Sequence, residues 1–501
     1  MRHIPLILCA LYGFMAPFPG FCEDRPIVSS ATQQCLDCHG TFHSGIVEDW
    51  KKSRHAVMTP EKAMGAAALS RKVSSSLVPD AMPRDFLAVV VGCAECHTQR
   101  PKSHADTFSH NGFDVHVVVS PEDCAACHSQ ERDQYGGNIM AHAWKNLAEN
   151  KIYQDLKQSI IGNPVRKSGK LAFESPDAHT NAETCFYCHG TRLTVTGFEK
   201  RDTDAGELEF PIIDGWPNQG VGRINLDGSK GACTSCHNRH SFSMETARKP
   251  YTCKECHTGP DVPAYKVYEI SKHGNIAASK QSSWDFQAVP WTVGRDFTAP
   301  TCATCHISLL ANTDGEVIVQ RTHLMNDRLS TRIFGLIYAH RQPKNPDTTL
   351  IRNSGGLQLP TDFDGTPAAQ YLIDDTEFQK RRKTLQSVCL SCHSLSWVKG
   401  HWQRYEHTIQ TTNAATRTAT DIMRDIWKKG YASGLDRGAS PFDESIEKKW
   451  SAIWLFDANN SRFAAAMAGG GDYGVFAEGR FALSTRVAEL NEWLMLKGKK
   501  D

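Results

Sequence analysis

The chain has 501 residues, with 56 basic and 55 acidic side chains, so its formal net charge is +1. This balance gives no reason to expect nucleic acid as a partner, because such partners select a strongly basic surface. No run of about 18 apolar residues follows the N-terminal segment, so we expect no transmembrane segment in the mature chain.

Residues 1–22 have the layout of an export signal. A short basic start is followed by a mostly apolar run over residues 4–18, and Gly20 and Cys22 lie at the third-last and last positions before the expected cut. The apolar run is too short to span a bilayer comfortably. We therefore predict a periplasmic protein, outside the reducing cytosol. Cys9 and Cys22 both belong to this segment.

The remaining sixteen cysteines form eight Cys-x-x-Cys-His runs, the attachment motif of c-type haem. The two thiols bond to the porphyrin, and the His that follows becomes an axial ligand of the iron. Disulfides or zinc sites do not explain a His after every second cysteine. We therefore predict eight covalent haems. The sets are Cys35, Cys38 and His39; Cys93, Cys96 and His97; Cys124, Cys127 and His128; Cys185, Cys188 and His189; Cys233, Cys236 and His237; Cys253, Cys256 and His257; Cys302, Cys305 and His306; and Cys389, Cys392 and His393.

Seven of the eight motifs lie between residues 35 and 306, at irregular spacing, so each unit would wrap one haem. Residues 48–58 and 138–160 have the apolar spacing of amphipathic helices. Residues 191–196 have the composition of a strand, and the glycines, prolines and aspartates that follow, up to residue 230, indicate turns.

The pattern changes near residue 375. Residues 376–431, 443–468 and 478–498 are rich in helix formers with helical apolar spacing, and Gly469-Gly470-Gly471 separates the last two. The predicted fold class is mainly α. A multihaem c-type cytochrome body with little β, over residues 23–375, is followed by a domain of long helices, residues 376–501, that carries the eighth haem.

The histidine count leaves two kinds of protein open. Of the 22 histidines, eight belong to the motifs and one to the signal, which leaves thirteen. A pure electron carrier would use eight of them as second axial ligands, whereas an enzyme would leave at least one iron open. The thirteen are His43, His55, His104, His110, His116, His142, His179, His240, His273, His323, His340, His401 and His407.

Several stretches are long enough to be specific. They are CFYCHGT at 185–191, GWPNQGVGRIN at 215–225, RHSFS at 239–243, CHTGPD at 256–261, SKHG at 271–274, Thr322-His323 and Asp472-Tyr473. Together they resemble the octahaem hydroxylamine oxidoreductase family over about residues 35–480.

The resemblance implies a catalytic fourth haem with an open distal face, for which His189 is the proximal ligand. It implies that Tyr473 is bonded covalently to the porphyrin of a neighbouring subunit. Asp261 matches an aspartate of the family's distal pocket and would accept protons. The family's next residue is a histidine, where this chain has Val262. Tyr338 is a candidate for a pocket tyrosine that occurs in the family.

The resemblance also implies seven haems with two His ligands each and a symmetric homotrimer. An apolar stretch of the C-terminal helices favours contacts with other copies. That stretch contains Trp450, Ile453, Trp454, Leu455, Phe456, Phe463 and Met467. By resemblance and placement, the expected second ligands are His55, His116, His142, His240, His273, His323 and either His401 or His407.

The expected function is oxidation of hydroxylamine, to nitric oxide or nitrite, with electrons passing to a c-type cytochrome. Three alternatives remain open. They are an octahaem reductase that takes nitrite or hydroxylamine to ammonia, a hydrazine dehydrogenase, and an electron-transfer cytochrome without enzymatic activity. Tyr473 favours oxidation. Val262 favours the reductase, because valine cannot share the proton transfer.

Overall fold

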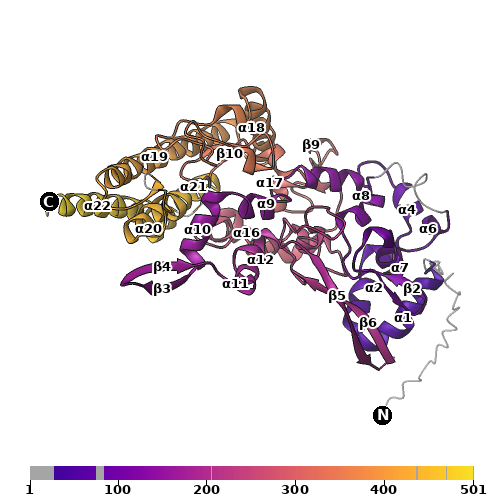
Figure 1. Ribbon diagram of the computed structural model, residues 1–501. Helices are drawn as coiled ribbons and strands as arrows, with labels where there is room; N and C mark the ends of the chain where they lie inside the picture. Colours follow the sequence, from indigo (N-terminus) through magenta and orange to yellow (C-terminus); the bar gives the residue numbers. More distant parts are fainter. Residues whose placement is uncertain (1–26, 75–83, 205, 436–437, 470, 500–501) are drawn as a thin grey trace, which may run out of the picture.

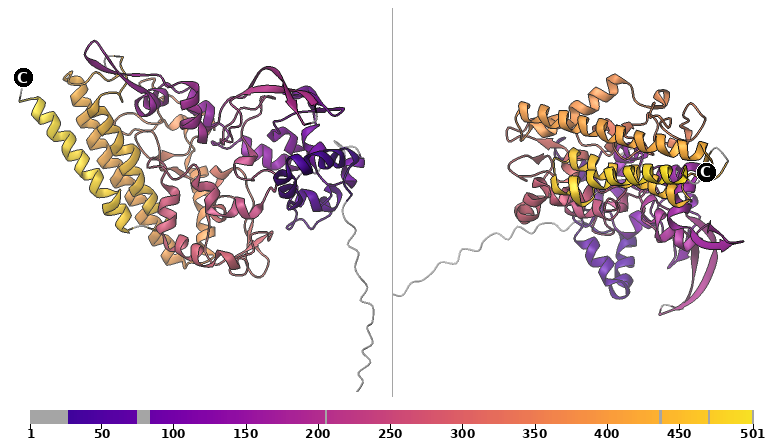
Figure 2. Two further views of the ribbon diagram at one scale, coloured as in Figure 1. Left: turned by 90° about the horizontal axis from the view of Figure 1, so that it is seen from below. Right: turned by 90° about the vertical axis from the view of Figure 1, so that its left-hand side faces the viewer.

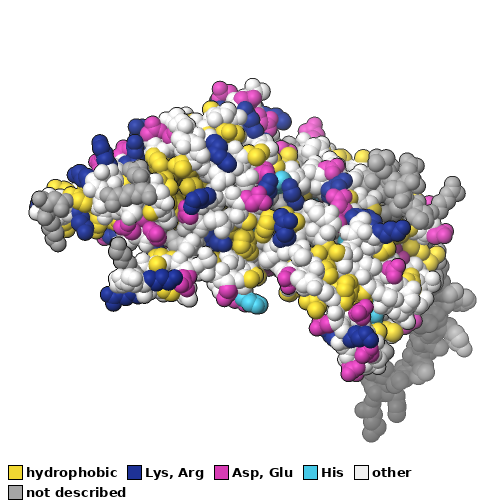
Figure 3. All heavy atoms as spheres, in the orientation of Figure 1, with side chains coloured by type: hydrophobic (Ala, Val, Ile, Leu, Met, Phe, Trp, Pro, Cys, Tyr) yellow, Lys and Arg dark blue, Asp and Glu magenta, His cyan; other side chains and the backbone are white. Residues whose placement is uncertain are grey.

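The computed structural model describes residues 27–74, 84–204, 206–435, 438–469 and 471–499. The predicted signal, with Cys9 and Cys22, lies outside these residues. In the part of the chain that is described, no helix combines the length and apolar character needed to cross a bilayer. Basic and acidic side chains are interspersed over the face drawn in Figure 3.

Short helices build the haem-bearing body, as predicted (Figure 1). Most motifs lie on a single helical turn, which places the two thiols on one face because positions i and i+3 are neighbours. The body helices that hold a whole motif are α1 (Ser30–Phe42), α7 (Cys93–His97), α8 (Pro121–Gly136), α12 (Cys185–His189) and α17 (Cys302–His306), and α14 (Pro250–Lys254) holds the first cysteine of the sixth motif. The other helices of the body are α2 (Ser44–Lys51), α3 (Arg54–Val57), α4 (Pro60–Met64), α6 (Arg84–Ala88), α9 (Ala143–Ala148), α10 (Lys151–Ile161), α11 (Ala178–Glu183), α13 (Met244–Arg248), α15 (Ala264–Ile270) and α16 (Lys272–Lys280).

Both amphipathic segments predicted in the body are helical, but each is divided in two. Ser53 ends the first segment and caps α3, since its side chain accepts a hydrogen bond from the Ala56 amide. Asn150 divides the second in the same way and accepts from the amides of Ile152 and Tyr153 at the start of α10. Side chains of this type compete with a continuing helix and favour its first position.

Within the part of the chain that the structure describes, the strands form five small sheets. The prediction of turns up to residue 230 is wrong in part, because β5 and β6 pair as a long antiparallel hairpin. Leu208, Phe210 and Ile212 alternate with polar residues, which is a strand pattern. Figure 2 shows this hairpin and β3–β4 extending from the body. The strands are β1 (Phe108–His110), β2 (Phe113–Val115), β3 (Asn163–Lys167), β4 (Lys170–Glu174), β5 (Thr194–Thr203), β6 (Gly206–Asp214), β7 (Trp291–Thr292), β8 (Leu310–Ala311), β9 (Val317–Val319), β10 (Thr331–Arg332) and β11 (His340–Arg341).

Long helices occupy the C-terminal part, as the apolar spacing predicted. Figure 2 shows α19, the α20–α21 segment and α22 lying side by side at one end of the molecule. The mainly α fold class is therefore confirmed. The helices are α18 (Asp375–Leu390), α19 (Leu395–Lys428), α20 (Ser445–Ala452), α21 (Ala458–Ala466) and α22 (Arg480–Lys497), with π-helical turns at Ile453–Asp457 and Tyr473–Ala477.

Four of the seven apolar residues expected to face other copies of the chain are buried inside this one, and Leu455, Phe456 and Met467 are half-buried. Trp450, Ile453 and Trp454 are each 0% exposed and form a core with side chains from α19 and α22. Phe463 is also buried. The inference of a trimer surface from this stretch was wrong, because periodic apolar residues on a helix do not reveal whether their partners belong to the same chain.

Replacing Trp450 by alanine is expected to cost about 3–5 kcal/mol in the free energy of unfolding of the C-terminal helices, because it removes a large side chain from a closed core. Chemical denaturation of the holoprotein, followed by circular dichroism, measures this. Leu496→Ala is the control, since Leu496 is 61% exposed on α22. Equal midpoints for the two variants would contradict the assignment of Trp450 to the core.

Candidate haem sites

A single large cavity lies among the first, second, third and fifth motifs. Its volume is about 2070 Å³, and both cysteines and the histidine of each of these motifs line it. Folded interiors are close-packed and hold few voids larger than a water molecule. A space of this size, bordered by paired thiols and imidazoles, fits several macrocycles.

Four buried arginines also indicate that a negatively charged group binds in the interior. Arg223, Arg248, Arg328 and Arg462 are buried, and none forms an ion pair with a carboxylate among the residues described. Burial lowers the pKa of Arg223, Arg248 and Arg328 to about 10 each. A buried guanidinium without a counter-ion is costly. Haem propionates would supply the missing negative charge.

None of the sixteen described cysteines forms a disulfide, although thiols of different motifs touch. Four pairs of thiols lie close enough to shift each other's pKa: Cys35 with Cys93, Cys124 with Cys233, Cys188 with Cys256, and Cys253 with Cys302. The fourth motif is thus next to the sixth, and the sixth is next to the seventh. Such neighbours would hold their haems close enough to exchange electrons.

The fourth motif is held by close backbone contacts. The Nδ1 of His189 donates to the Ala143 carbonyl at 3.3 Å, which leaves Nε2 for an iron. Gly222 permits this approach, since a Cβ there would lie 2.7 Å from the His189 carbonyl oxygen. Gly190 has φ +90, a conformation that favours glycine.

Two imidazoles that share an iron have ring centres roughly 6 Å apart, because each metal–nitrogen bond is about 2 Å. Five motif histidines have such a neighbour, and in four of these pairs the geometry fits a shared iron. These four pairs are His39 with His110 (6.0 Å), His55 with His128 (6.4 Å), His237 with His323 (6.4 Å) and His273 with His393 (6.0 Å). Sequence reasoning missed His110, which lies on the β1–β2 hairpin.

His116, one of the predicted second ligands, does not fit as the ligand of the second haem. Its ring centre is 6.0 Å from that of His97, but its backbone carbonyl accepts a hydrogen bond from His97 Nδ1 at 2.8 Å. His116 therefore lies on the side of His97 that faces away from an iron bound at Nε2. His240 is the other histidine near His97: burial lowers its pKa, and the neighbouring His97 adds to this shift.

The other predicted second ligands are less closely defined. His142 is buried, and its Nε2 donates to the Gly136 carbonyl at 3.0 Å. His401 stacks on Trp397, which itself stacks on His393. His407 is exposed on α19. His340 was not predicted, but burial lowers its pKa to about 3, and its Nδ1 contacts the Arg341 carbonyl at 2.6 Å.

Asp261 lies near the fourth motif. Burial lowers the pKa of His189, and the charge of Asp261 opposes this shift. Burial also lowers the pKa of His257, and the Asp261 carboxylate opposes this shift. The pKa of Cys185 is raised mainly by burial, and Asp261 adds to this effect. The Asp261 carbonyl accepts a hydrogen bond from Asn459 Nδ2 at 3.0 Å, so α21 helps to fix this loop.

Tyr473 and Tyr338 have different surroundings. Tyr473 packs in an apolar cluster with Val262, and its hydroxyl lies 3.0 Å from Asn460 Oδ1 and 2.9 Å from Glu478 Oε2. Tyr338 is 2% exposed in the core of the C-terminal helices, where its hydroxyl donates to the Phe363 carbonyl at 2.6 Å. The fold thus packs Tyr473 and Val262 against the same apolar cluster, whereas the Tyr338 hydroxyl is bonded within the core of the C-terminal helices.

Comparison with known proteins agrees with these sites. The family model "Seven times multi-haem cytochrome CxxCH" matches residues 221–330, and "Cytochrome c554 and c-prime" matches residues 123–209. A solved structure described as a hypothetical multiheme protein is 37% identical, with a TM-score of 0.87 over 94% of this chain and 96% of that chain. The chain belongs to the multihaem c-type cytochromes.

Two further relatives of the cytochrome come from Kuenenia stuttgartiensis. A probable nitrite reductase-hydroxylamine oxidoreductase fusion protein is 25% identical over 389 residues, which are 75% of this chain. The cytochrome spans only 35% of the length of that curated relative. A reducing HAO-like protein complex is 18% identical, with a TM-score of 0.59 over 94% of this chain and 87% of that chain, and shares the fold.

The mature cytochrome is expected to carry eight haems, because each motif offers two thiols and an imidazole in one place. Its intact mass after export should exceed that of the polypeptide by eight haem masses. A stable excess of seven or fewer in fully matured, active protein would contradict the count.

Proposed function

We propose that the cytochrome oxidises hydroxylamine at its fourth haem, whose distal face is open, and passes the electrons through seven haems with two His ligands each. A periplasmic c-type cytochrome would accept them. The observation that carries this proposal is the position of Asp261. Its negative charge raises the pKa of His189 in the fourth motif and of His257 in the sixth, against the larger effect of burial. Among the residues described, His189, His257 and His306 have no second imidazole at the distance seen for the four His pairs, and Asp261 lies near the first two of them.

Each residue then has a defined task. The haem at Cys185 and Cys188 would supply an iron that binds the nitrogen lone pair and accepts electrons. His189 would hold that iron, and its hydrogen bond to the Ala143 carbonyl fixes the imidazole and would make it a better donor. Asp261 takes up protons from the substrate, which a carboxylate within hydrogen-bond reach can do. Val262 leaves Asp261 without the partner that a histidine would provide.

The thiol contacts support a path for the electrons. Cys188 touches Cys256, and Cys253 touches Cys302, so the fourth, sixth and seventh haems would form a continuous group. His273 on α16 lies opposite His393, so the eighth haem would be held between the body and α19. Electrons released at the fourth haem would leave through this group.

Reduction of nitrite or hydroxylamine to ammonia is the second candidate. Two observations favour it. Val262 stands where a proton-sharing histidine would be useful for oxidation, and one relative of the same fold is named as a reducing complex. Anaerobic assays of one preparation in both directions separate the candidates. We expect hydroxylamine oxidation with an artificial acceptor to exceed nitrite reduction with a reduced dye, and the reverse order would select the reductase.

A covalent bond between Tyr473 and the fourth haem of a neighbouring subunit belongs to the same proposal. Next to Tyr473, Val475, Phe476 and Phe481 are exposed by 39, 66 and 61%, which suits contact with another copy in a homotrimer. Wild-type protein should run as coloured covalent trimers in denaturing electrophoresis, and Tyr473→Phe should run as monomers. Tyr371→Phe, which changes a tyrosine outside this segment, should keep the trimers. Monomers from wild type would remove the cross-link and favour the reductase.

A further inference from the structure

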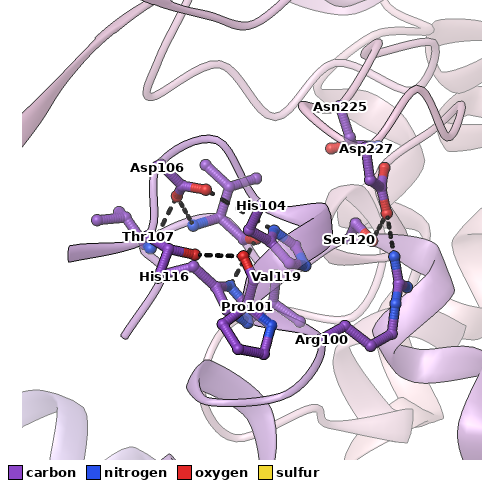
Figure 4. Close-up of polar contacts among 12 residues, drawn as sticks. Arg100, Pro101, His104, Asp106, Thr107, His116, Val119, Ser120, Asn225 and Asp227 are labelled. Carbon is purple, nitrogen blue, oxygen red and sulfur yellow. Dashed lines mark hydrogen bonds and ion pairs between the residues drawn. The ribbon is translucent and has the colours of Figure 1, made fainter. Parts of the chain in front are cut away.

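A buried polar cluster lies behind the second haem motif, between the β1–β2 hairpin and α8. Figure 4 shows His104, Asp106 and His116 together near Arg100. His104 Nε2 lies 3.1 Å from Asp123 Oδ1, and its Nδ1 lies 3.7 Å from Asp106 Oδ1. Burial alone would lower the pKa of His104, but the two carboxylates more than offset this and raise it to about 9.

The cluster is not shaped for a shared metal ion. The rings of His104 and His116 are stacked, with centres 3.6 Å apart and planes 5° apart. The lone pairs of an imidazole lie in the plane of its ring, so two stacked rings cannot direct them to one ion. The arrangement instead fixes the His116 ring, whose Nδ1 also donates to the Val118 carbonyl at 3.1 Å.

The cluster connects directly to the ligand of the second haem. His97 Nδ1 donates to the His116 carbonyl at 2.8 Å, and the His116 amide donates to the His97 carbonyl at 2.9 Å. Asp106 Oδ2 accepts from the amides of Val117 and Val118, each at 2.8 Å. Asp106 therefore holds the backbone whose carbonyl orients the imidazole of His97.

The carboxylates nearest to His97 are Asp106 and Asp123. Asp227 lies farther off, between Arg100 and the buried Arg223, whereas Asp106 and Asp123 are buried and both raise the pKa of His97 against the effect of burial. Arg100 lies 3.0 Å from Asp227 and 3.3 Å from Asp123. A ferric haem carries one positive charge more than a ferrous haem, so buried negative charge nearby stabilises the oxidised form. A firm hydrogen bond from the imidazole to a carbonyl acts in the same direction, because it makes the ligand more basic.

We propose that Asp106 is a positioning residue that fixes His97 through the His116 backbone and keeps the reduction potential of the second haem low. The effect does not depend on the substrate of the cytochrome. A low reduction potential would keep the second haem mostly oxidised. It would therefore influence how electrons distribute among the first, second, third and fifth haems.

The test is a potentiometric titration of the holoprotein, followed by electron paramagnetic resonance. In Asp106→Asn, all eight haems should be present, and the midpoint potential of one of them should rise while the others stay unchanged. Asp114→Asn is the matched control, because Asp114 lies exposed on β2 of the same hairpin. It should leave every potential as in wild type, and Asp106→Glu should shift the potential less than Asp106→Asn.

Unchanged potentials in Asp106→Asn with full haem content would overturn the proposal, as would an equal shift in Asp114→Asn. If Asp106→Asn does not mature, His104→Gln provides the second variant. It removes a positive charge, so the potential of the same haem should fall. A rise in His104→Gln would contradict the assigned sign. A new high-spin signal in His116→Gln would show that His116 is itself an iron ligand and would also overturn the proposal.

Discussion

A chain with Cys185→Ala and Cys188→Ala is expected to mature with seven haems and to lose substrate turnover completely. The two thiols are the covalent attachment of the fourth haem, and the proposed chemistry has no other open iron. His189 remains in this variant, but an imidazole without its haem binds no substrate. Intact mass gives the haem count, and the rate of hydroxylamine oxidation with an artificial electron acceptor gives the activity.

The matched control is the double change Cys35→Ala and Cys38→Ala, which also leaves seven haems. Cys38 is one of the exposed cysteines, at the end of the molecule formed by α1. Turnover with an artificial acceptor should persist in this variant, because its fourth, sixth and seventh haems are untouched. Substantial turnover without the fourth haem would assign the reaction to another iron.

Asp261→Asn is expected to slow hydroxylamine oxidation by about 10²–10⁴-fold, the usual contribution of a positioned proton acceptor. The amide keeps the size of the side chain but cannot take up a proton. The carbonyl that accepts from Asn459 belongs to the backbone, so the loop should keep its place. Steady-state rates across pH, together with the haem content, measure the effect.

Two further variants test the same role of Asp261. Glu269→Gln changes an exposed carboxylate on the neighbouring α15 and should retain full activity. Val262→His should raise the rate near neutral pH, because histidine titrates there and can share the proton transfer with Asp261. Rates equal to wild type in Asp261→Asn would exclude Asp261 from the mechanism.

The haem attachment residues could be predicted from sequence because their chemistry is local. Two thiols and an imidazole must lie within one helical turn, so five consecutive residues define each site. The C-terminal helices could also be predicted, since apolar spacing persists over their length. The division at Asn150 was not foreseen, because a short polar side chain within a periodic segment gave the only local signal.

The second ligands could not be predicted as reliably, because they depend on contacts between distant segments. His110 faces His39 only because the β1–β2 hairpin folds back over α1. His116 lies within the same loop, but its backbone meets His97, and its ring stacks on His104. Trp450 shows the same limit, since its apolar neighbours come from helices far away in the sequence.

Cyanide binding to the oxidised holoprotein tests the open fourth haem most directly. Electron paramagnetic resonance should show one high-spin haem per chain, and cyanide should convert it to a low-spin form at one equivalent per chain. The seven other haems should not respond, because each already has two His ligands. Eight low-spin haems before any addition, with no uptake of cyanide, would contradict the account and identify the protein as an electron carrier.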